Sequence, residues 1–144
     1  MSSQLNVDTI VDKAGSGGSN VKMANTSTYV SDGGAVTQNT VQGLVKAWGN
    51  LDGTGTIAIR DSYNIASATD EGTGIYDFNY TNNMNNDDYS ANENVSETSG
   101  VEGNLNRYPA IDGVSTSDIR FGATYNGSSH DVDELYVTIH GDLA

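Results

Sequence analysis

The sequence has no cysteine and a single proline, and its lysine and arginine residues together number only 6. Without cysteine, the chain cannot form a disulfide framework, a zinc–thiolate site or a thiol nucleophile. Hydrophobic residues make up 35% of the 144 residues and charged residues 17%, both below the usual share in globular proteins. So few long aliphatic side chains do not suit a thick helical core, and this composition favours thin layers of short strands.

The scarcity of basic residues excludes several kinds of partner. The 19 acidic residues outnumber the 6 basic ones and give a formal net charge of -13. Duplex binding depends on basic contacts to phosphate, so we expect no nucleic-acid partner. No apolar run is long enough to span a bilayer, and the opening MSSQLNVDTIV lacks the basic and apolar parts of a secretory signal. We therefore expect no membrane insertion, and synthesis in a cytoplasm without export.

Glycine, in contrast, is abundant, with 17 residues that mark repeated turns. The stretch GTGTIAIRDSYNIASATDEGTGIYDFNY, residues 53–80, contains Gly-Thr-Gly twice, and each copy precedes an alternation of apolar and polar residues. Such alternation is typical of a half-buried strand. We predict that each Gly-Thr-Gly ends a turn and begins a strand of an antiparallel sheet. Ile57 and Ile59 of the first strand then pack against the ladder of aromatic residues on the second, formed by Tyr76, Phe78 and Tyr80.

Alternation recurs in QLNVDTIVD (residues 4–12), SDIRFGATYNGS and DELYVTIHGD, and less clearly in YSANENVSE. Asn126-Gly127 is a dipeptide favoured in tight hairpins. The segment AGSGGSN is predicted as a flexible linker, and GVEGNLNRYPAIDGV as a long connection. No segment after residue 50 keeps a helical period. The sequence therefore predicts an all-β protein, in which an extended N-terminal arm (residues 1–40) precedes an antiparallel, jelly-roll-like β-sandwich (residues 41–144).

Few residues are suited to catalysis or to metal binding. His130 and His140 are ten residues apart in the sequence and share no motif. The acidic cluster beside His130 and the oxygen-rich loop at residues 85–88 both lack the spacing of a calcium loop. We expect no catalytic residue, no metal and no cofactor. The tyrosines leave two interpretations open, stacking surface for sugars or the core of a thin sandwich: Tyr63, Tyr76, Tyr80, Tyr89, Tyr108, Tyr125 and Tyr136.

Several spaced elements, taken in order, resemble a module of tail-fibre and related virion proteins of marine phages. They are Lys46-Ala47-Trp48, Gly53-Thr54-Gly55, Ile59–Asn64, Gly72-Thr73-Gly74 and Tyr76–Thr81. The resemblance covers about a third of the chain. The sequence departs from it at Gly49 and Leu51, where the similar proteins carry bulkier or aromatic residues, and at Asp52, where Asn is more usual. The central residues of the module are Trp48, Ile57, Ile59, Arg60, Tyr63, Tyr76 and Phe78.

The resemblance implies a structural role on the virion surface and no enzyme activity. From it we expect a short fibre, knob or spike that forms a homotrimer. Its other expected partners are tail or capsid proteins of the virion and a host cell-surface glycan. Trimer formation would cover strand edges and tyrosine faces that a thin sandwich leaves exposed. The N-terminal arm is the expected virion attachment segment, because its alternating residues could add to a sheet edge of a neighbour: Leu5, Val7, Ile10 and Val11.

Three other functions compete with this expectation. Within the virion, a capsid decoration or head fibre protein fits a short chain with an arm equally well. A carbohydrate-binding module would need an aromatic platform on one exposed face, so buried tyrosines would count against it. A glycan-cleaving depolymerase would need paired carboxylates in a groove, for which this length leaves little room.

Overall fold

A computed structural model describes residues 27–30, 34, 37–96 and 106–143 of the chain. The chain divides into two compact units, Met1–Val41 and Gln42–Ala144. All regular structure in the described residues is β, with antiparallel pairing throughout, which confirms the predicted fold class. The predicted strand at residues 4–12, the linker that follows it and the attachment residues Leu5, Val7, Ile10 and Val11 lie outside the described residues.

The described part of the N-terminal unit is a pair of short strands, β1 (Thr28–Val30) and β2 (Thr37–Asn39). At the end of the pair away from the turn, the backbone N–H of Thr40 donates to the carbonyl of Ser27 at 2.9 Å. Its sequence is polar and aperiodic, and no strand is predicted there. The pairing is local, and Gly34, which lies between the two strands, has a φ of 72°.

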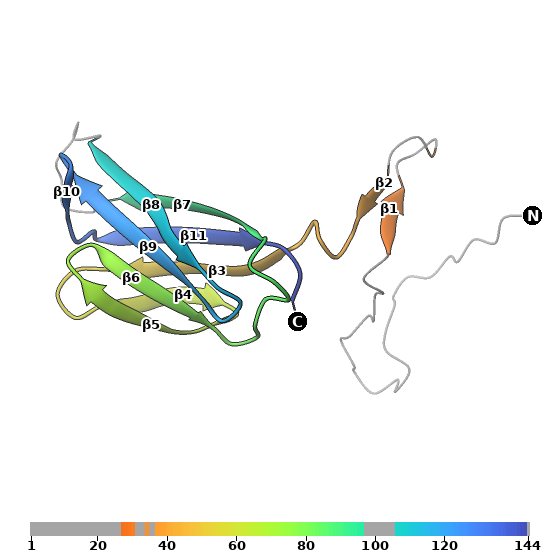
Figure 1. The fold of residues 1–144 in the computed structure, drawn as a ribbon, viewed down its shortest axis with the longest axis horizontal. Helices are drawn as coiled ribbons and strands as arrows, with labels where there is room; N and C mark the ends of the chain where they lie inside the picture. The colour runs from red at the N-terminus through yellow and green to blue at the C-terminus, as the bar shows by residue number, and fades with distance from the viewer. Residues whose placement is uncertain (1–26, 31–33, 35–36, 97–105, 144) are drawn as a thin grey trace, which may run out of the picture. The chain divides into compact units, whose positions relative to one another are not determined.

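The C-terminal unit, which we call the head, contains two sheets (Figure 1). The first has the order β4-β3-β11-β7. Its strands are β3 (Val45–Asp52), β4 (Ala58–Tyr63), β7 (Ser90–Ser96) and β11 (Glu134–His140).

The second sheet has β9 at its centre, paired with β6 and β8 and with the short β10, and β5 pairs with the far side of β6. Its strands are β5 (Ile65–Gly72), β6 (Ile75–Tyr80), β8 (Arg107–Val114), β9 (Asp118–Tyr125) and β10 (Ser128–Ser129). Asn126 and Gly127 form the turn between β9 and β10 with φ angles of 49° and 81°, as the dipeptide predicts.

The two sheets pack face to face and bury one core between them (Figure 1). Alternate residues of the inner strands point inward, which confirms the predicted period of two. Phe78 and Phe121 are fully buried and meet edge to face with their ring centroids 5.8 Å apart. The other buried apolar residues are Ala47, Leu51, Tyr76, Tyr80, Met84, Ile119, Ala123, Val132, Leu135, Val137 and Ile139.

The two Gly-Thr-Gly segments are the turns of the β3–β4 and β5–β6 hairpins, as predicted. Each contains a glycine at which a side chain would clash with neighbouring atoms. A Cβ on Gly53 would lie 2.5 Å from the hydroxyl of Tyr76, and one on Gly74 would lie 2.5 Å from the carbonyl of Ala123. The Tyr76 hydroxyl is also within hydrogen-bonding distance of the Gly53 carbonyl, at 3.0 Å, and accepts from the backbone N–H of Val132 at 3.3 Å. These contacts join the two sheets at one end of the sandwich.

Two strands of the second sheet differ from the sequence prediction. β8 lies within the predicted long connection, and the proline and glycine that indicated a connection are both accommodated in it. Among the described strands, β8 pairs with β9 alone, so the N–H that Pro109 lacks is tolerated there, and Gly113 follows a register shift. β5 was not predicted as a strand. Only its Ile65 and Ala68 are partly buried against the core, so its sequence shows no clear alternation of apolar and polar residues.

Candidate functional site

The outer face of the β4-β3-β11-β7 sheet carries a group of exposed aromatic side chains. Tyr63 on β4 is paired with Trp48 on β3, and Tyr136 on β11 is paired with Asn50, two residues further along β3. Trp48 is 36% exposed, Tyr63 53% and Tyr136 37%. Directly opposite and diagonal neighbours of this kind are within reach of one another across a sheet. We call the surface formed by Trp48, Tyr63 and Tyr136 the aromatic face.

A charged network lies at one end of the aromatic face. Arg60 contacts Asp52 on β3 at 2.9 Å and Glu134 on β11 at 2.5 Å. The Tyr136 hydroxyl also donates to Glu134, and the Ser96 hydroxyl donates to the same carboxylate at 3.0 Å. The hydrogen bond from Arg60, together with those from Thr54, lowers the pKa of Asp52 to about 2. The pKa of Glu134 is lowered chiefly by its hydrogen bond from Tyr136.

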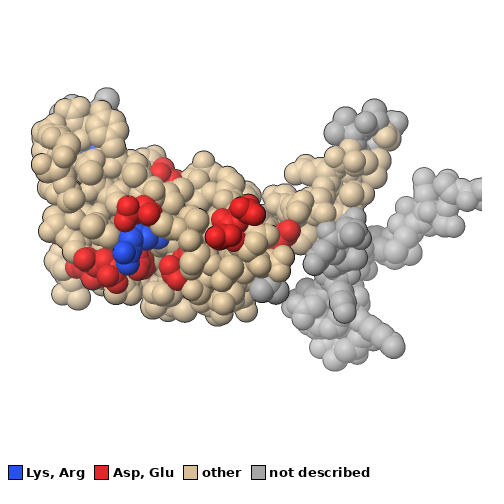
Figure 2. Space-filling view, viewed as in Figure 1, with Lys and Arg blue, Asp and Glu red and all other residues tan. Residues whose placement is uncertain are grey.

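The outer face of the second sheet carries a similar network around Arg120. Its guanidinium forms two bonds to Asp77 on β6, at 2.6 and 2.7 Å, and lies 3.5 Å from Glu71. The hydrogen bonds to Asp77 raise the pKa of Arg120. Figure 2 shows a small basic patch surrounded by acidic side chains on this face of the head. These charges bind one another across β5, β6 and β9 and form a structural network.

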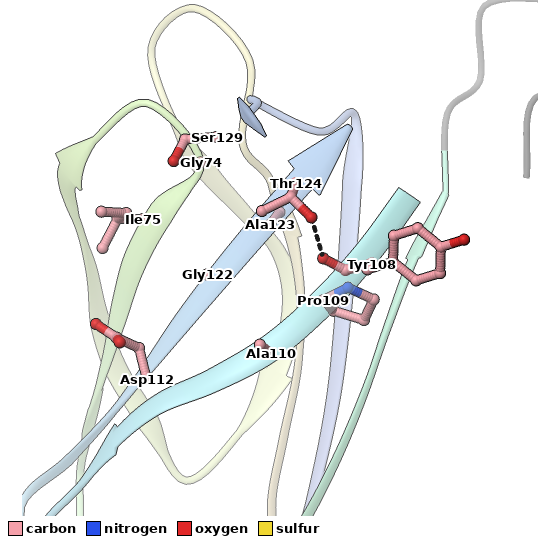
Figure 3. A pocket seen from close by; sticks show the side chains of 10 residues that line it. All are labelled: Gly74, Ile75, Tyr108, Pro109, Ala110, Asp112, Gly122, Ala123, Thr124 and Ser129. Atoms are coloured by element: carbon pink, nitrogen blue, oxygen red, sulfur yellow. Dashed lines mark hydrogen bonds between the residues drawn. The ribbon is translucent and has the colours of Figure 1, made fainter. Parts of the chain in front are cut away.

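Next to Arg120, the same face is hollowed by a pocket of about 290 Å³ (Figure 3). Its floor is the pair Gly122 on β9 and Ala110 on β8, which lie opposite each other in the ladder. Ile75 forms one wall, and Figure 3 places Asp112 and Tyr108 at opposite ends. We call this feature the hollow; its lining is completed by Gly74, Pro109, Ala123, Thr124 and Ser129.

The residues considered for catalysis or metal binding do not converge. Asp131 accepts the backbone N–H of Gly74 at 2.7 Å, and the His130 ring lies 5.4 Å from that of Tyr125. His140 lies at the end of β11, paired with Ser90. Among the residues that the structure describes, no three histidine, aspartate or glutamate side chains could together hold a metal ion. Nor do the described residues include a helix with the length and apolarity needed to span a bilayer.

The tyrosines divide between the two interpretations left open by the sequence. Tyr76 and Tyr80 are buried in the core, and burial raises the pKa of both. Tyr89 and Tyr125 are partly buried. The remaining three of the seven are exposed, on the aromatic face and at the hollow: Tyr63, Tyr136 and Tyr108.

The central residues of the sequence module are placed in three different environments. Tyr76 and Phe78 are in the core, and Ile57 and Ile59 are partly buried against it. Arg60 belongs to the charged network, and Trp48 and Tyr63 belong to the aromatic face. At the departure noted above, a Cβ on Gly49 would lie 3.3 Å from the ring of Phe78, so this ring fills the space that a bulkier residue would use.

The hollow was not predicted from the sequence. It depends on Gly122 and Ala110, whose small size gives no functional signal, and on Tyr108 and Asp112 in a segment predicted as a connection. Comparisons with family models, with curated proteins and with solved structures give no match for this chain.

Proposed function

We propose that this chain is a phage virion structural protein, a short fibre, knob or spike component exposed on the particle, with no enzyme activity. The observation that carries the proposal is the aromatic face, because the head exposes Trp48, Tyr63 and Tyr136 while its clustered charges are paired with each other. Such a surface is suited to binding another macromolecule. The spaced sequence elements that resemble virion proteins support the particle as the setting.

The aromatic face is proposed as the contact between copies in a homotrimer. Adding copies would bury aromatic area that a single head leaves in water, which stabilises the assembly by the hydrophobic effect. Light scattering on the full chain at micromolar concentration is expected to give the mass of a trimer. Replacing both Trp48 and Tyr63 with serine should give a folded monomer. Tyr108→Ser, which removes an even more exposed ring from the opposite sheet, is the control and should leave the trimer intact.

The N-terminal unit is proposed to attach the head to the particle. Deleting residues 1–14 should leave a folded head that no longer joins particles lacking the native protein. Incorporation of the truncated chain at normal copy number would place the attachment in the head and contradict this assignment. Electron microscopy of particles carrying a gold-labelled chain would separate attachment to the tail from the alternative of a capsid decoration or head fibre protein.

The aromatic face also supports a second candidate, a carbohydrate-binding module. A tryptophan and a tyrosine side by side on a sheet can stack on sugar rings. The serine variants distinguish the two functions. If the wild-type chain is a monomer that binds an oligosaccharide, and the double variant loses this binding without changing mass, the carbohydrate-binding module is the correct function.

A further inference from the structure

The hollow results from missing side chains on an otherwise covered sheet. A Cβ added to Gly122 would have only the Ala110 carbonyl oxygen within 4 Å, at 3.8 Å, so the space above this glycine is open. The neighbouring Ala110 adds only a methyl group, and Ile75 closes the side toward β6. The floor is therefore flat and apolar, and its volume of about 290 Å³ lies at the lower limit of ligand pockets. A pocket of this size accepts one small ring.

Polar groups surround this apolar floor, and one of them makes no hydrogen bond within the described part of the chain. Asp112 is exposed, and its carboxylate makes no hydrogen bond or ion pair with any residue that the structure describes. The Thr124 hydroxyl donates to the Tyr108 carbonyl at 3.3 Å, as drawn in Figure 3, and its lone pairs remain available as acceptors. The Ser129 side chain is exposed at the rim. The hollow thus offers hydrogen-bond acceptors around a flat apolar surface.

We propose that the hollow binds a single neutral saccharide ring of a surface glycan. A pyranose ring has an apolar face of C–H groups, which fits the Gly122–Ala110 floor, and hydroxyl groups that donate to Asp112 and to Thr124. This inference rests on the proposed function, in which the head meets a host surface, and it adds the site and the chemical class of the ligand. The hollow and the aromatic face are on the outer faces of different sheets, so a trimer formed through the aromatic face leaves the hollow accessible.

The charges around the hollow select against anionic ligands. An anionic sugar would meet Asp112, Asp77 and Glu71 on a chain of net charge -13. Arg120 is held by Asp77 and Glu71 and interacts electrostatically with Asp112, so it partly offsets the charge of the Asp112 carboxylate. Asp112 therefore serves as a hydrogen-bond acceptor for hydroxyl groups.

Titration of the isotopically labelled full chain by NMR tests this proposal. The probes are methyl glycosides of glucose, galactose, mannose and N-acetylglucosamine at millimolar concentration, where single sugar rings bind. Glucuronate is the anionic counterpart. At least one neutral glycoside is expected to shift the backbone amides of Gly122, Ile75 and Asp112.

Two variants and one control locate the site. Gly122→Val fills the hollow and should abolish these shifts. Asp112→Ala should raise the Kd about tenfold, because a hydrogen bond to a charged group is lost. Gly113→Ala adds a methyl group to the same strand face, beside Arg120 at 3.7 Å and outside the hollow, and should bind like the wild type. Asp112 is exposed, so its variant remains informative if the glycine variant does not fold.

Three results would overturn the inference: no shift with any neutral glycoside, equal or tighter binding of glucuronate, or unchanged binding by both site variants. Particle incorporation of the wild-type chain separates this failure from that of the proposed function. Normal incorporation of a wild-type chain that binds no saccharide would refute the hollow alone. Saccharide binding by a chain that never joins a particle would refute the virion role alone.

Discussion

The two outer faces of the sandwich use the same electrostatic arrangement but differ in what surrounds it. On each face one arginine bridges carboxylates from neighbouring strands, Arg60 with Asp52 and Glu134, and Arg120 with Asp77 and Glu71. Beside Arg60 the positions nearby carry large rings and form a flat aromatic surface. Beside Arg120 they carry glycine and alanine and form the hollow.

This difference indicates how a head with few charged residues can present surfaces of different shape. Paired surface charges contribute modestly to stability, since both arginine side chains are more than a third exposed. The size of the outward-facing side chains decides whether a face is flat or concave. A flat aromatic surface suits a broad protein contact, and a concave surface suits a small ligand.

The largest expected effect comes from removing the core that both faces share. Phe78 is fully buried beneath Gly49 and against Phe121, so Phe78→Ala should lower the free energy of unfolding by about 3–5 kcal/mol. Both faces should then lose order in one transition in urea, followed by Trp48 fluorescence and by far-ultraviolet circular dichroism. Separate transitions for the two probes would mean that the sheets are not held by one core.

Two glycines on opposite sides of their sheets provide a sharper comparison. Gly49 faces inward, and a Cβ added to it would lie 3.3 Å from the Phe78 ring, whereas Gly122 faces the open hollow. Gly49→Val should cost about 1–3 kcal/mol through overpacking. Gly122→Val should be neutral or stabilising by up to about 1 kcal/mol, because a strand favours valine over glycine. Equal destabilisation by both variants, measured by urea unfolding, would contradict the outward orientation of Gly122.

The smallest expected effect comes from the charged network around Arg60 and depends on pH. Asp52 has its pKa lowered from 3.8 to about 2 in the folded chain, chiefly by Arg60, so it binds a proton more readily when unfolded. Its contribution to stability is therefore complete above about pH 4 and is lost as the pH falls toward 2. The effect is small because the pair is exposed to solvent. Urea unfolding of wild type and Asp52→Asn should give curves that differ above pH 4 and converge near pH 2.

The difference between the faces marks the limit of what the sequence predicts. The inner pattern was predictable, because Tyr76, Phe78 and Tyr80 alternate with polar residues and the core requires this period. The Gly-Thr-Gly turns were also predictable, because each precedes a run of alternating apolar and polar residues. β8 was not, because Pro109 and Gly113 are signals for a loop, and their tolerance depends on the position of the strand at an edge.

The surfaces were harder to predict than the core. Trp48 and Tyr63 are fifteen positions apart in the sequence, and only the register of β3 with β4 brings them opposite each other. A strand of alternating residues also does not reveal which sheet neighbour it will have. The hollow needs Gly122 beside Ala110, a juxtaposition that depends on the pairing of β8 with β9.

The position of β3 in its sheet has a mechanical consequence for a protein attached through its N-terminal unit. β3 begins at Val45, soon after the boundary at Val41, and is hydrogen-bonded to β4 on one side and to β11 on the other. A pull transmitted along β3 loads the hydrogen bonds of both ladders together, in shear, whereas a pull on an edge strand would open a single ladder one bond after another. If the N-terminal unit attaches the chain to a particle as proposed, tension arriving from it would be distributed over both ladders of β3.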